Sequence, residues 1–434
     1  MIPVETIRRS VLDQRDLVES LFRELAEGSA DTQGVTRDTY GRGENFAHAL
    51  FARRSAAMGL DVSTDIAGNT YATWQGSDRS LPRVLIGSHL DSVRQGGNFD
   101  GAAGVVAGLA SVAALRSIGL QPRCDIQTMG VRAEESAWFQ VSYIGSRSAL
   151  GRLPDGALNA RRVDTGKSLF EYIAECGGDP TAIEQGVRSI DPASVRAFIE
   201  VHIEQAPSLI EAELPIAICT AIPGNFRYSH VKVHGEHGHV GLPRRFRRDS
   251  VMAAVDFAHE LDRLWESYES AGQSMACTLG RFHTDPAFHG LTNVPGLFHF
   301  SLDVRAYDED QLKKVEREVL EIVSRIERKR SVKFDMGVRA SAAVGVADAQ
   351  IRRGLVDGAA ALGIPSMLLG SPGSHDSAAF AESGVPMGMI FVRNANGSHN
   401  PREAMEIDDF LDAVSVLSLW LAENACAPVP ARGR

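Results

Sequence analysis

The sequence predicts an α/β protein whose main sheet is mostly parallel and into which a smaller ferredoxin-like domain is inserted. Two observations predict this class. Strand-like and helix-like segments alternate along the first half of the chain, and after about residue 228 the order becomes strand, helix, strand, strand, helix, strand. The pattern of apolar helix-like and strand-like segments then returns in GSHDSAAFAESGVPMGMIFV. We therefore expect a large domain formed by residues 1–219 and 334–434, and an inserted domain formed by residues 220–333.

The large domain begins with an amphipathic helical segment and continues with apolar strands. The apolar run at 84–88 predicts a strand, and the alanine-rich stretch at 101–119 predicts the helix after it. Two further strands are predicted at 125–131 and 197–203. Strands that alternate with helices in this way usually form a parallel sheet that is covered on both faces.

The inserted domain follows a different order of elements. Its predicted strands are 228–235, 277–283, 297–306 and 332–338, and its predicted helices are 249–265 and 308–329. This order is typical of a ferredoxin-like unit.

Composition excludes several classes of function. A net charge of −10 provides no cationic surface for nucleic acid, so a small solute is the expected partner. The chain has no apolar run of 18 residues and no signal-type start, which predicts a cytoplasmic protein without a membrane segment. Its five cysteines form no CxxC pair, so we expect reduced core thiols rather than disulfides or a thiolate metal site.

Polar residues follow the predicted strand at 84–88 where it ends. His89 and Asp91 come directly after it, and Asp100 precedes Gly101 and the alanine-rich helix. In an open α/β sheet such positions line the ligand crevice. His89 could bind a metal while Asp91 holds the other ring nitrogen. A capped helix, with Asp100 as the N-cap and His89 as an ordinary rim histidine, stays open as the alternative.

Three other strand ends carry the same kinds of residue. Glu134 and Glu135 follow the strand at 125–131, His202 ends the strand at 197–203, and His399 lies just past a third. Each has an ordinary alternative as a surface acid or a hydrogen-bonded histidine, but together they favour one site. Histidines and carboxylates without thiolates suit Zn²⁺, Mn²⁺, Co²⁺ or Ni²⁺, and they suffice for two ions if one carboxylate bridges. Such a pair supports hydrolysis.

The chain resembles a known family of amidohydrolases in a series of ordered motifs. These run from about residue 40 to 411 and include GSHLDSV, GGNFDGAAGV, GSRSALG, VHIEQAP, NVPG, SLDVR, SHDSAAFA and GSHNPRE. They are similar to those of N-carbamoyl-L-amino-acid hydrolases, allantoate amidohydrolases and β-ureidopropionases. The resemblance implies hydrolysis of a linear, non-peptide C–N bond in a small carboxylate substrate, by a homodimer that uses two divalent metal ions per subunit.

The resemblance also implies a role for each residue at the strand ends. His89 and His202 would bind one metal, Glu135 and His399 the other, and Asp100 would bridge them. Glu134 would be the general base that takes a proton from the attacking water and returns it to the leaving nitrogen.

The inserted domain would act as a lid and dimerisation domain. From it His239 would act as the oxyanion donor, with His237 as the alternative because only spacing separates the two. Arg305, on the polar face of the alternating strand at 297–306, would bind the substrate carboxylate. The other expected substrate contacts are Gln205, Asn293 and Gly373.

Departures from the family pattern concern the pocket and lid rather than the metals. The chain has EESAWF, HVGLPRRF and NVPG at positions where the family has EEG.RF, HAGTTPM and NVIPG. They suggest that Trp138 lines or narrows the site. Two other functions stay open: a metal-dependent aminoacylase or dipeptidase, which more often has a carboxylate in place of His202, and a non-catalytic binding protein, which would be expected to lose part of the ligand set.

Overall fold

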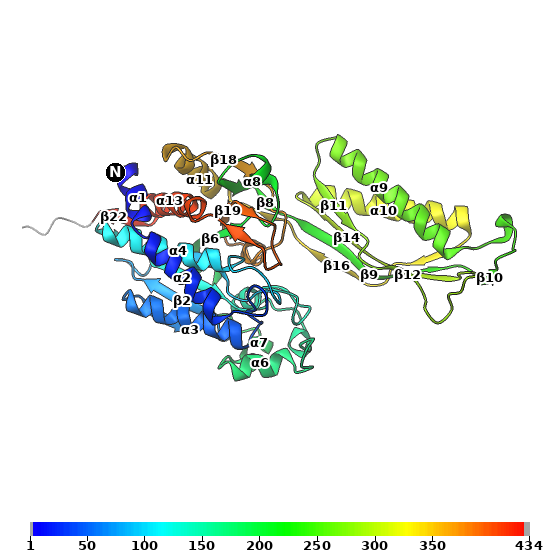
Figure 1. Cartoon of the computed structure of the whole chain (residues 1–434), viewed down its shortest axis with the longest axis horizontal. Helices are drawn as coiled ribbons and strands as arrows, with labels where there is room; N and C mark the ends of the chain where they lie inside the picture. Colours follow the sequence, from blue (N-terminus) through cyan, green and yellow to red (C-terminus); the bar gives the residue numbers. More distant parts are fainter. Residues whose placement is uncertain (1–2, 429–434) are drawn as a thin grey trace, which may run out of the picture. The chain divides into compact units, whose positions relative to one another are not determined.

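The computed structural model describes residues 3–428 and forms two compact units (Figure 1). Unit 1 runs to Ile222 and resumes at Val346, and unit 2 is Pro223–Gly345. The insertion expected from the sequence ended at residue 333. Unit 2 extends further because β15 (Lys333–Asp335) and β16 (Arg339–Ala342) both pair with β9 (Gly224–His234).

Unit 1 is built on an eight-stranded sheet in the order β1-β2-β5-β3-β6-β19-β7-β18. Its strands are β1 (Asp61–Thr64), β2 (Thr70–Trp74), β3 (Arg83–His89), β5 (Ile126–Val131), β6 (Val195–Ile203), β7 (Ile216–Cys219), β18 (Ser366–Leu369) and β19 (Met387–Val392). The central strands β5, β3, β6 and β19 are parallel to one another, which confirms the predicted mainly parallel sheet.

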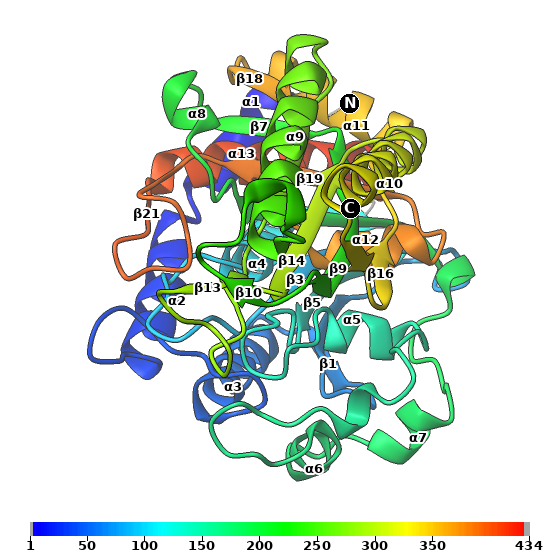
Figure 2. The same cartoon turned by 90° about the vertical axis from the view of Figure 1, so that its right-hand side faces the viewer.

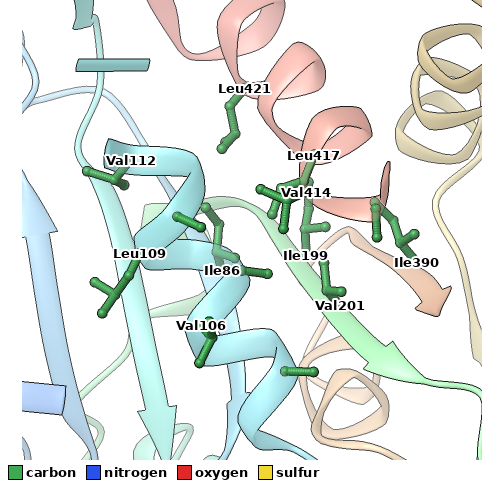
Figure 3. Close-up of a cluster of buried hydrophobic side chains, with 14 of the residues drawn as sticks. Ile86, Val106, Leu109, Val112, Ile199, Val201, Ile390, Val414, Leu417 and Leu421 are labelled. Carbon is green, nitrogen blue, oxygen red and sulfur yellow. The ribbon is translucent and has the colours of Figure 1, made fainter. Parts of the chain in front are cut away.

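Helices cover both faces of this sheet. One face packs against α1 (Val4–Leu12), α2 (Arg15–Gly28), α3 (Arg42–Ala57), α4 (Ala102–Ser117), α11 (Ala349–Ala361) and α13 (Ile407–Asn424), and the other against α5 (Ile144–Ala149) and α12 (Asp376–Glu382). Neighbouring residues of β3 point to opposite faces. Ile86 packs with Val106 of α4 and Leu417 of α13 (Figure 3), whereas Leu85 joins Phe198, whose ring stacks on Phe380 at 3.9 Å.

Shorter elements connect these layers. They are β4 (Leu120–Pro122), α6 (Leu169–Glu175), α7 (Pro180–Glu184), α8 (Ser208–Glu211), β8 (Ala221–Ile222), β17 (Gly345–Val346), β20 (Asn394–Ala395), β21 (Ala404–Met405) and β22 (Cys426–Pro428). No helix among residues 3–428 is long and apolar enough to cross a membrane.

Unit 2 has the predicted ferredoxin-like order of elements, with α9 (Ser250–Ser270) and α10 (Glu309–Arg330) on one face of its sheet (Figure 2). The main strand order is β11-β14-β9-β15, where β11 is Met275–Thr278 and β14 is Leu297–Ala306. The prediction of a single strand at 277–283 is wrong. Two short strands, β11 and β12 (Phe282–Thr284), occupy this part of the chain, and both pair with the same edge of β14. A short ribbon of β10 (Gly238–His239) and β13 (Asn293–Val294) completes the unit.

The core beneath α13 should be sensitive to the truncation of single apolar side chains. We expect Leu417→Ala to lower the free energy of unfolding by about 2–5 kcal/mol, since the fully buried side chain leaves a cavity between α13 and the sheet. Leu12→Ala is the matched control, because Leu12 is 44% exposed and should change stability by less than about 0.5 kcal/mol. Urea unfolding of both variants measures the difference, and equal losses would contradict this description of the core.

Candidate active site

Asp100 lies at the centre of a buried cluster in unit 1. Its Oδ1 is 3.6 Å from His89 Nε2 and 3.3 Å from His202 Nε2, and its Oδ2 is 3.3 Å from His399 Nε2. Glu135 Oε1 is 3.1 Å from the same His399 nitrogen. Three groups of possible ligands lie close enough together to hold an ion. Two of them share Asp100, namely His89, Asp100 and His202 on one side and Asp100, Glu135 and His399 on the other, and the third is Glu200, His202 and His375.

The sheet brings these residues together from distant parts of the chain. His89 is the last residue of β3, His202 is the last but one of β6, and Glu135 follows the end of β5. Because β3, β5 and β6 are parallel, their carboxyl ends meet at one edge of the sheet. Asp100 lies in the turn before α4, and His399 lies in the loop between β20 and β21.

Backbone carbonyl groups fix the orientation of two histidine rings. Nδ1 of His89 is 3.0 Å from the Asp91 carbonyl oxygen, and Nδ1 of His202 is 2.9 Å from that of Ile203. A carbonyl oxygen can only accept, so each Nδ1 donates its proton and each Nε2 presents a lone pair toward Asp100. This is the tautomer that a metal-binding histidine needs.

The donor atoms of the cluster fit a divalent cation. Asp100 Oδ1 and His202 Nε2 are buried and have no hydrogen-bond partner among the described residues, although buried polar atoms rarely stay unpaired. Imidazole nitrogens and carboxylate oxygens are suitable ligands for Zn²⁺, Mn²⁺, Co²⁺ and Ni²⁺. The cluster therefore forms a candidate metal centre.

Asp91 contacts both His89 and the adjacent glutamates. Its backbone carbonyl is 3.0 Å and its carboxylate Oδ1 3.4 Å from His89 Nδ1. The carboxylate also accepts the backbone N–H of Glu134 at 3.0 Å and of Glu135 at 3.2 Å, and the hydroxyl of Thr39 at 2.6 Å. Asp91 thus holds the adjacent glutamates in place.

The two glutamates lie on an irregular turn, as their adjacency in an otherwise extended segment requires. The chain leaves β5 after Val131 and passes through Ala133 at φ 57°, in the left-handed region. Glu44 holds this turn, because its Oε1 accepts the N–H of Ala133 at 2.8 Å and its Oε2 pairs with Arg132 at 3.1 Å.

Electrostatics distinguish the carboxyl groups. Burial raises the pKa of Glu134 well above its usual range. The negative charges of Glu135 and Asp376 raise this pKa further, whereas His89 lowers it. Burial also acts to raise the pKa of Asp100, but the adjacent rings of His202, His399 and His89 outweigh it and hold that pKa well below its usual range.

Sequence reasoning missed several residues that support Asp100. Glu403 Oε1 accepts the N–H of Phe99 at 2.9 Å and of Asp100 at 3.2 Å. Ser398 donates its hydroxyl to Asp100 Oδ2 at 2.8 Å, and the buried Arg37 donates to the carbonyl oxygens of Leu90, Asn98 and Asp100. Ser398 and Glu403 fall within the motif GSHNPRE and could have been considered, whereas no pattern marks Arg37.

Gln205 and Gly373, both expected to contact substrate, lie beside the cluster. Gln205 donates through Nε2 to Asp100 Oδ2 at 3.0 Å, and its backbone has φ 66°. A Cβ atom on Gly373 would lie 3.2 Å from Gln205 Oε1, so the two residues are neighbours.

Trp138 supports the site rather than lining it. Its side chain is 4% exposed and packs with Tyr40 and Leu158 in a separate cluster, and its indole N–H donates to the Ser92 carbonyl at 2.9 Å. The expectation that Trp138 narrows the pocket is therefore wrong, since a buried indole has almost no surface to offer a substrate.

The remaining expected contacts belong to unit 2. His239 and Asn293 are directly opposite each other in the ribbon of β10 and β13. The N–H of Gly241 donates to His239 Nδ1 at 3.1 Å, so a neutral ring carries its proton on the exposed Nε2. His237 Nδ1 accepts the N–H of Gly296 at 3.1 Å. Arg305 lies on the polar face of β14, where Asp303 accepts from its Nε at 2.9 Å.

The fold and the cluster define a class of protein, a hydrolase built on a mainly parallel sheet with a candidate metal site at the carboxyl ends of its strands. The chain belongs to peptidase family M20/M25/M40, whose sequence model matches residues 85–423, and it is an amidohydrolase that acts on non-peptide C–N bonds.

Known relatives cover almost the whole chain. The N-carbamoyl-L-amino acid amidohydrolase of Geobacillus stearothermophilus is 32% identical over 93% of this chain and 98% of its own length. The ureidoglycolate hydrolase of Arabidopsis thaliana is 29% identical over 91% of this chain and 83% of its own. Among solved structures, a hydantoinase/carbamoylase family amidase from Burkholderia ambifaria is 27% identical, with a TM-score of 0.81 over 95% of this chain and 98% of its own.

Gly101 should be more sensitive to a methyl group than other glycines with positive φ. A Cβ atom at Gly101 would lie 2.5 Å from the His89 ring, whereas at Gly119 it would meet no atom within 4 Å. The two glycines have positive φ values of 68° and 72°, so each substitution carries backbone strain of about 1–3 kcal/mol, and Gly101, with ψ −50°, lies outside the left-handed helical region. We expect the lower melting temperature for Gly101→Ala. Equal melting temperatures would show that the position of the His89 ring does not require a residue without a side chain at position 101.

Proposed function

We propose that this protein hydrolyses the carbamoyl C–N bond of an N-carbamoyl-L-amino acid or a related ureido acid, such as allantoate or β-ureidopropionate. The observation that carries the proposal is the shared Asp100, which joins two groups of candidate metal ligands beside a glutamate whose pKa is raised. The similarity to N-carbamoyl-L-amino acid amidohydrolases over 93% of the chain supports the substrate class.

Two divalent ions per subunit would be held by this cluster. His89 and His202 would hold one ion, Glu135 and His399 the other, and Asp100 would be common to both. Bound there, the ions would polarise the scissile carbonyl and make water a better nucleophile.

The chain's own residues would bind the substrate and transfer the proton. Glu134 would take the proton of the attacking water and return it to the leaving nitrogen. Arg305 would bind the substrate carboxylate, and the Nε2–H of His239 would stabilise the developing oxyanion, with Asn293 opposite it as a further contact. Gln205 and Gly373 would contact the substrate from unit 1.

Unit 2 would act as the lid and as the dimerisation surface of a homodimer. A cytoplasmic location is supported by the cysteines, because all five are free thiols and a reducing compartment keeps thiols in this state. The expected partner is a small carboxylate rather than nucleic acid or a membrane.

A panel of substrates tests the proposal. It contains N-carbamoyl, N-formyl and N-acetyl L-amino acids, a dipeptide, β-ureidopropionate and allantoate. Cleavage of a ureido substrate supports the proposal. Exclusive cleavage of N-acetyl amino acids or of the dipeptide would instead identify an aminoacylase or dipeptidase, and His202 argues against that alternative because those relatives more often have a carboxylate at this position.

The metal requirement gives a prediction of its own. Purified protein should contain up to two divalent ions per chain by elemental analysis, and a chelator should remove both the ions and the activity, since the proposed hydrolysis depends on the ions to activate water and polarise the carbonyl. Mn²⁺, Co²⁺, Ni²⁺ and Zn²⁺ are then added back separately. Full activity in protein that contains no metal would refute the assignment.

Glu134 and Glu135 should respond differently to the same substitution. Glu134→Gln removes only the proton-accepting oxygen, so we expect both metals to stay bound and kcat to fall by roughly 10²- to 10⁴-fold. Glu135→Gln should lose one metal, because an amide is a poorer ligand than a carboxylate. Elemental analysis and steady-state kinetics separate the two outcomes. If Glu134→Gln lost a metal and Glu135→Gln did not, the two roles would have to be exchanged.

A further inference from the structure

One carboxylate holds two arginines on the polar face of unit 2. Asp303 Oδ1 accepts from Arg305 Nε at 2.9 Å, and its Oδ2 is 2.5 Å from Arg227 Nε. The side chains of Arg227, Asp303 and Arg305 are 42%, 25% and 34% exposed. Among the described residues, Asp303 is the ion-pair partner of both arginines and neither has another.

The register of the sheet explains this arrangement. Arg227 of β9 is directly opposite Asp303 of β14, and Asp303 and Arg305 lie two residues apart on the same face. The intervening Val304 and the neighbouring Phe226 point into the core on the opposite face. One carboxylate can therefore reach a guanidinium along its own strand and another across to the next strand.

Small residues leave the arginines uncovered. Ala276 on one side and Asn225 on the other are opposite Arg305, and Ala340 is opposite Arg227. The alanines cannot reach over a guanidinium group, and both arginine side chains are partly exposed, so the terminal nitrogens remain accessible to a ligand.

We propose that Arg227 and Asp303 are positioning residues that hold Arg305 ready to bind the single carboxylate of the substrate. This inference rests on the proposed function. Asp303 occupies Nε of Arg305 and leaves both terminal nitrogens free for a two-point contact with a carboxylate. Arg227 binds the other oxygen of Asp303 and so restrains the carboxylate that orients Arg305.

The charge of the group agrees with one carboxylate. Two guanidinium groups and one carboxylate leave a net charge of +1, which a single substrate carboxylate neutralises. A flexible arginine would have to lose side-chain entropy when the substrate binds, and the contact with Asp303 lowers that cost in advance.

A double-mutant cycle tests the inference with the ureido substrate that the wild-type enzyme cleaves best. Arg227→Gln and Asp303→Asn should each raise KM by about threefold to tenfold, as expected for a partly exposed charged contact, and leave kcat within about twofold. Because Arg227 acts through Asp303, the double variant should have the KM of Asp303→Asn alone. Arg227→Lys should restore part of the loss, because it keeps the charge.

The control is Lys232→Gln, an exposed cation on the same strand whose opposite neighbours are His299 and Asp335; its KM should be unchanged. Thermal unfolding of each variant verifies that unit 2 is folded. Fully additive effects on KM, or a fall in kcat without a change in KM, would overturn the positioning role. Absence of ureido hydrolysis by the wild-type enzyme would instead refute the proposed function, and this inference with it.

Discussion

The burial of the Asp100 carboxylate is the constraint on which the rest of unit 1 depends. A carboxylate that is 3% exposed is costly unless charges and hydrogen bonds compensate it. Three histidines surround it, Gln205 and Ser398 donate to Oδ2, and Glu403 accepts its backbone N–H. These contacts come from the edge of the sheet, the start of α4 and the loop between β20 and β21. The strand ends and the surrounding loops are therefore fixed relative to one another by the same group.

Several residues at this edge adopt a backbone conformation that side chains disfavour. Ala133 precedes the two glutamates at φ 57°, Gln205 has φ 66° and His399 has φ 59°. Each such residue costs of order 1–3 kcal/mol and persists only where its surroundings enforce it. At Ala133 that enforcement is visible, because Glu44 accepts its N–H and Asp91 accepts the N–H of both following residues. The strain places two consecutive carboxyl groups at one site, which an extended strand could not do.

The sequence was informative where a local pattern carries the structure and silent where contacts are distant. The apolar run before His89 and the alternation of β14 predict which strands end at the cluster and which face Arg305 occupies. They do not show that Arg227 is opposite Asp303, because the register of β9 and β14 pairs residues that are far apart in the sequence. Trp138 was misjudged for the same reason: proximity in sequence to Glu134 did not reveal that its ring is buried with Tyr40.

The two units also differ in how readily they can accept substitutions. The candidate metal ligands and Glu134 belong to unit 1, whereas His239, Asn293 and Arg305 belong to unit 2, which has its own apolar core. The departure HVGLPRRF lies wholly in unit 2, and every ligand in unit 1 is retained. Separate cores let substitutions accumulate around the residues proposed to bind substrate without disturbing the packing beneath Asp100. Substitutions around the proposed substrate contacts of unit 2 can therefore leave the packing beneath Asp100 unchanged, while the cluster around Asp100, whose members depend on one another, has little freedom to vary.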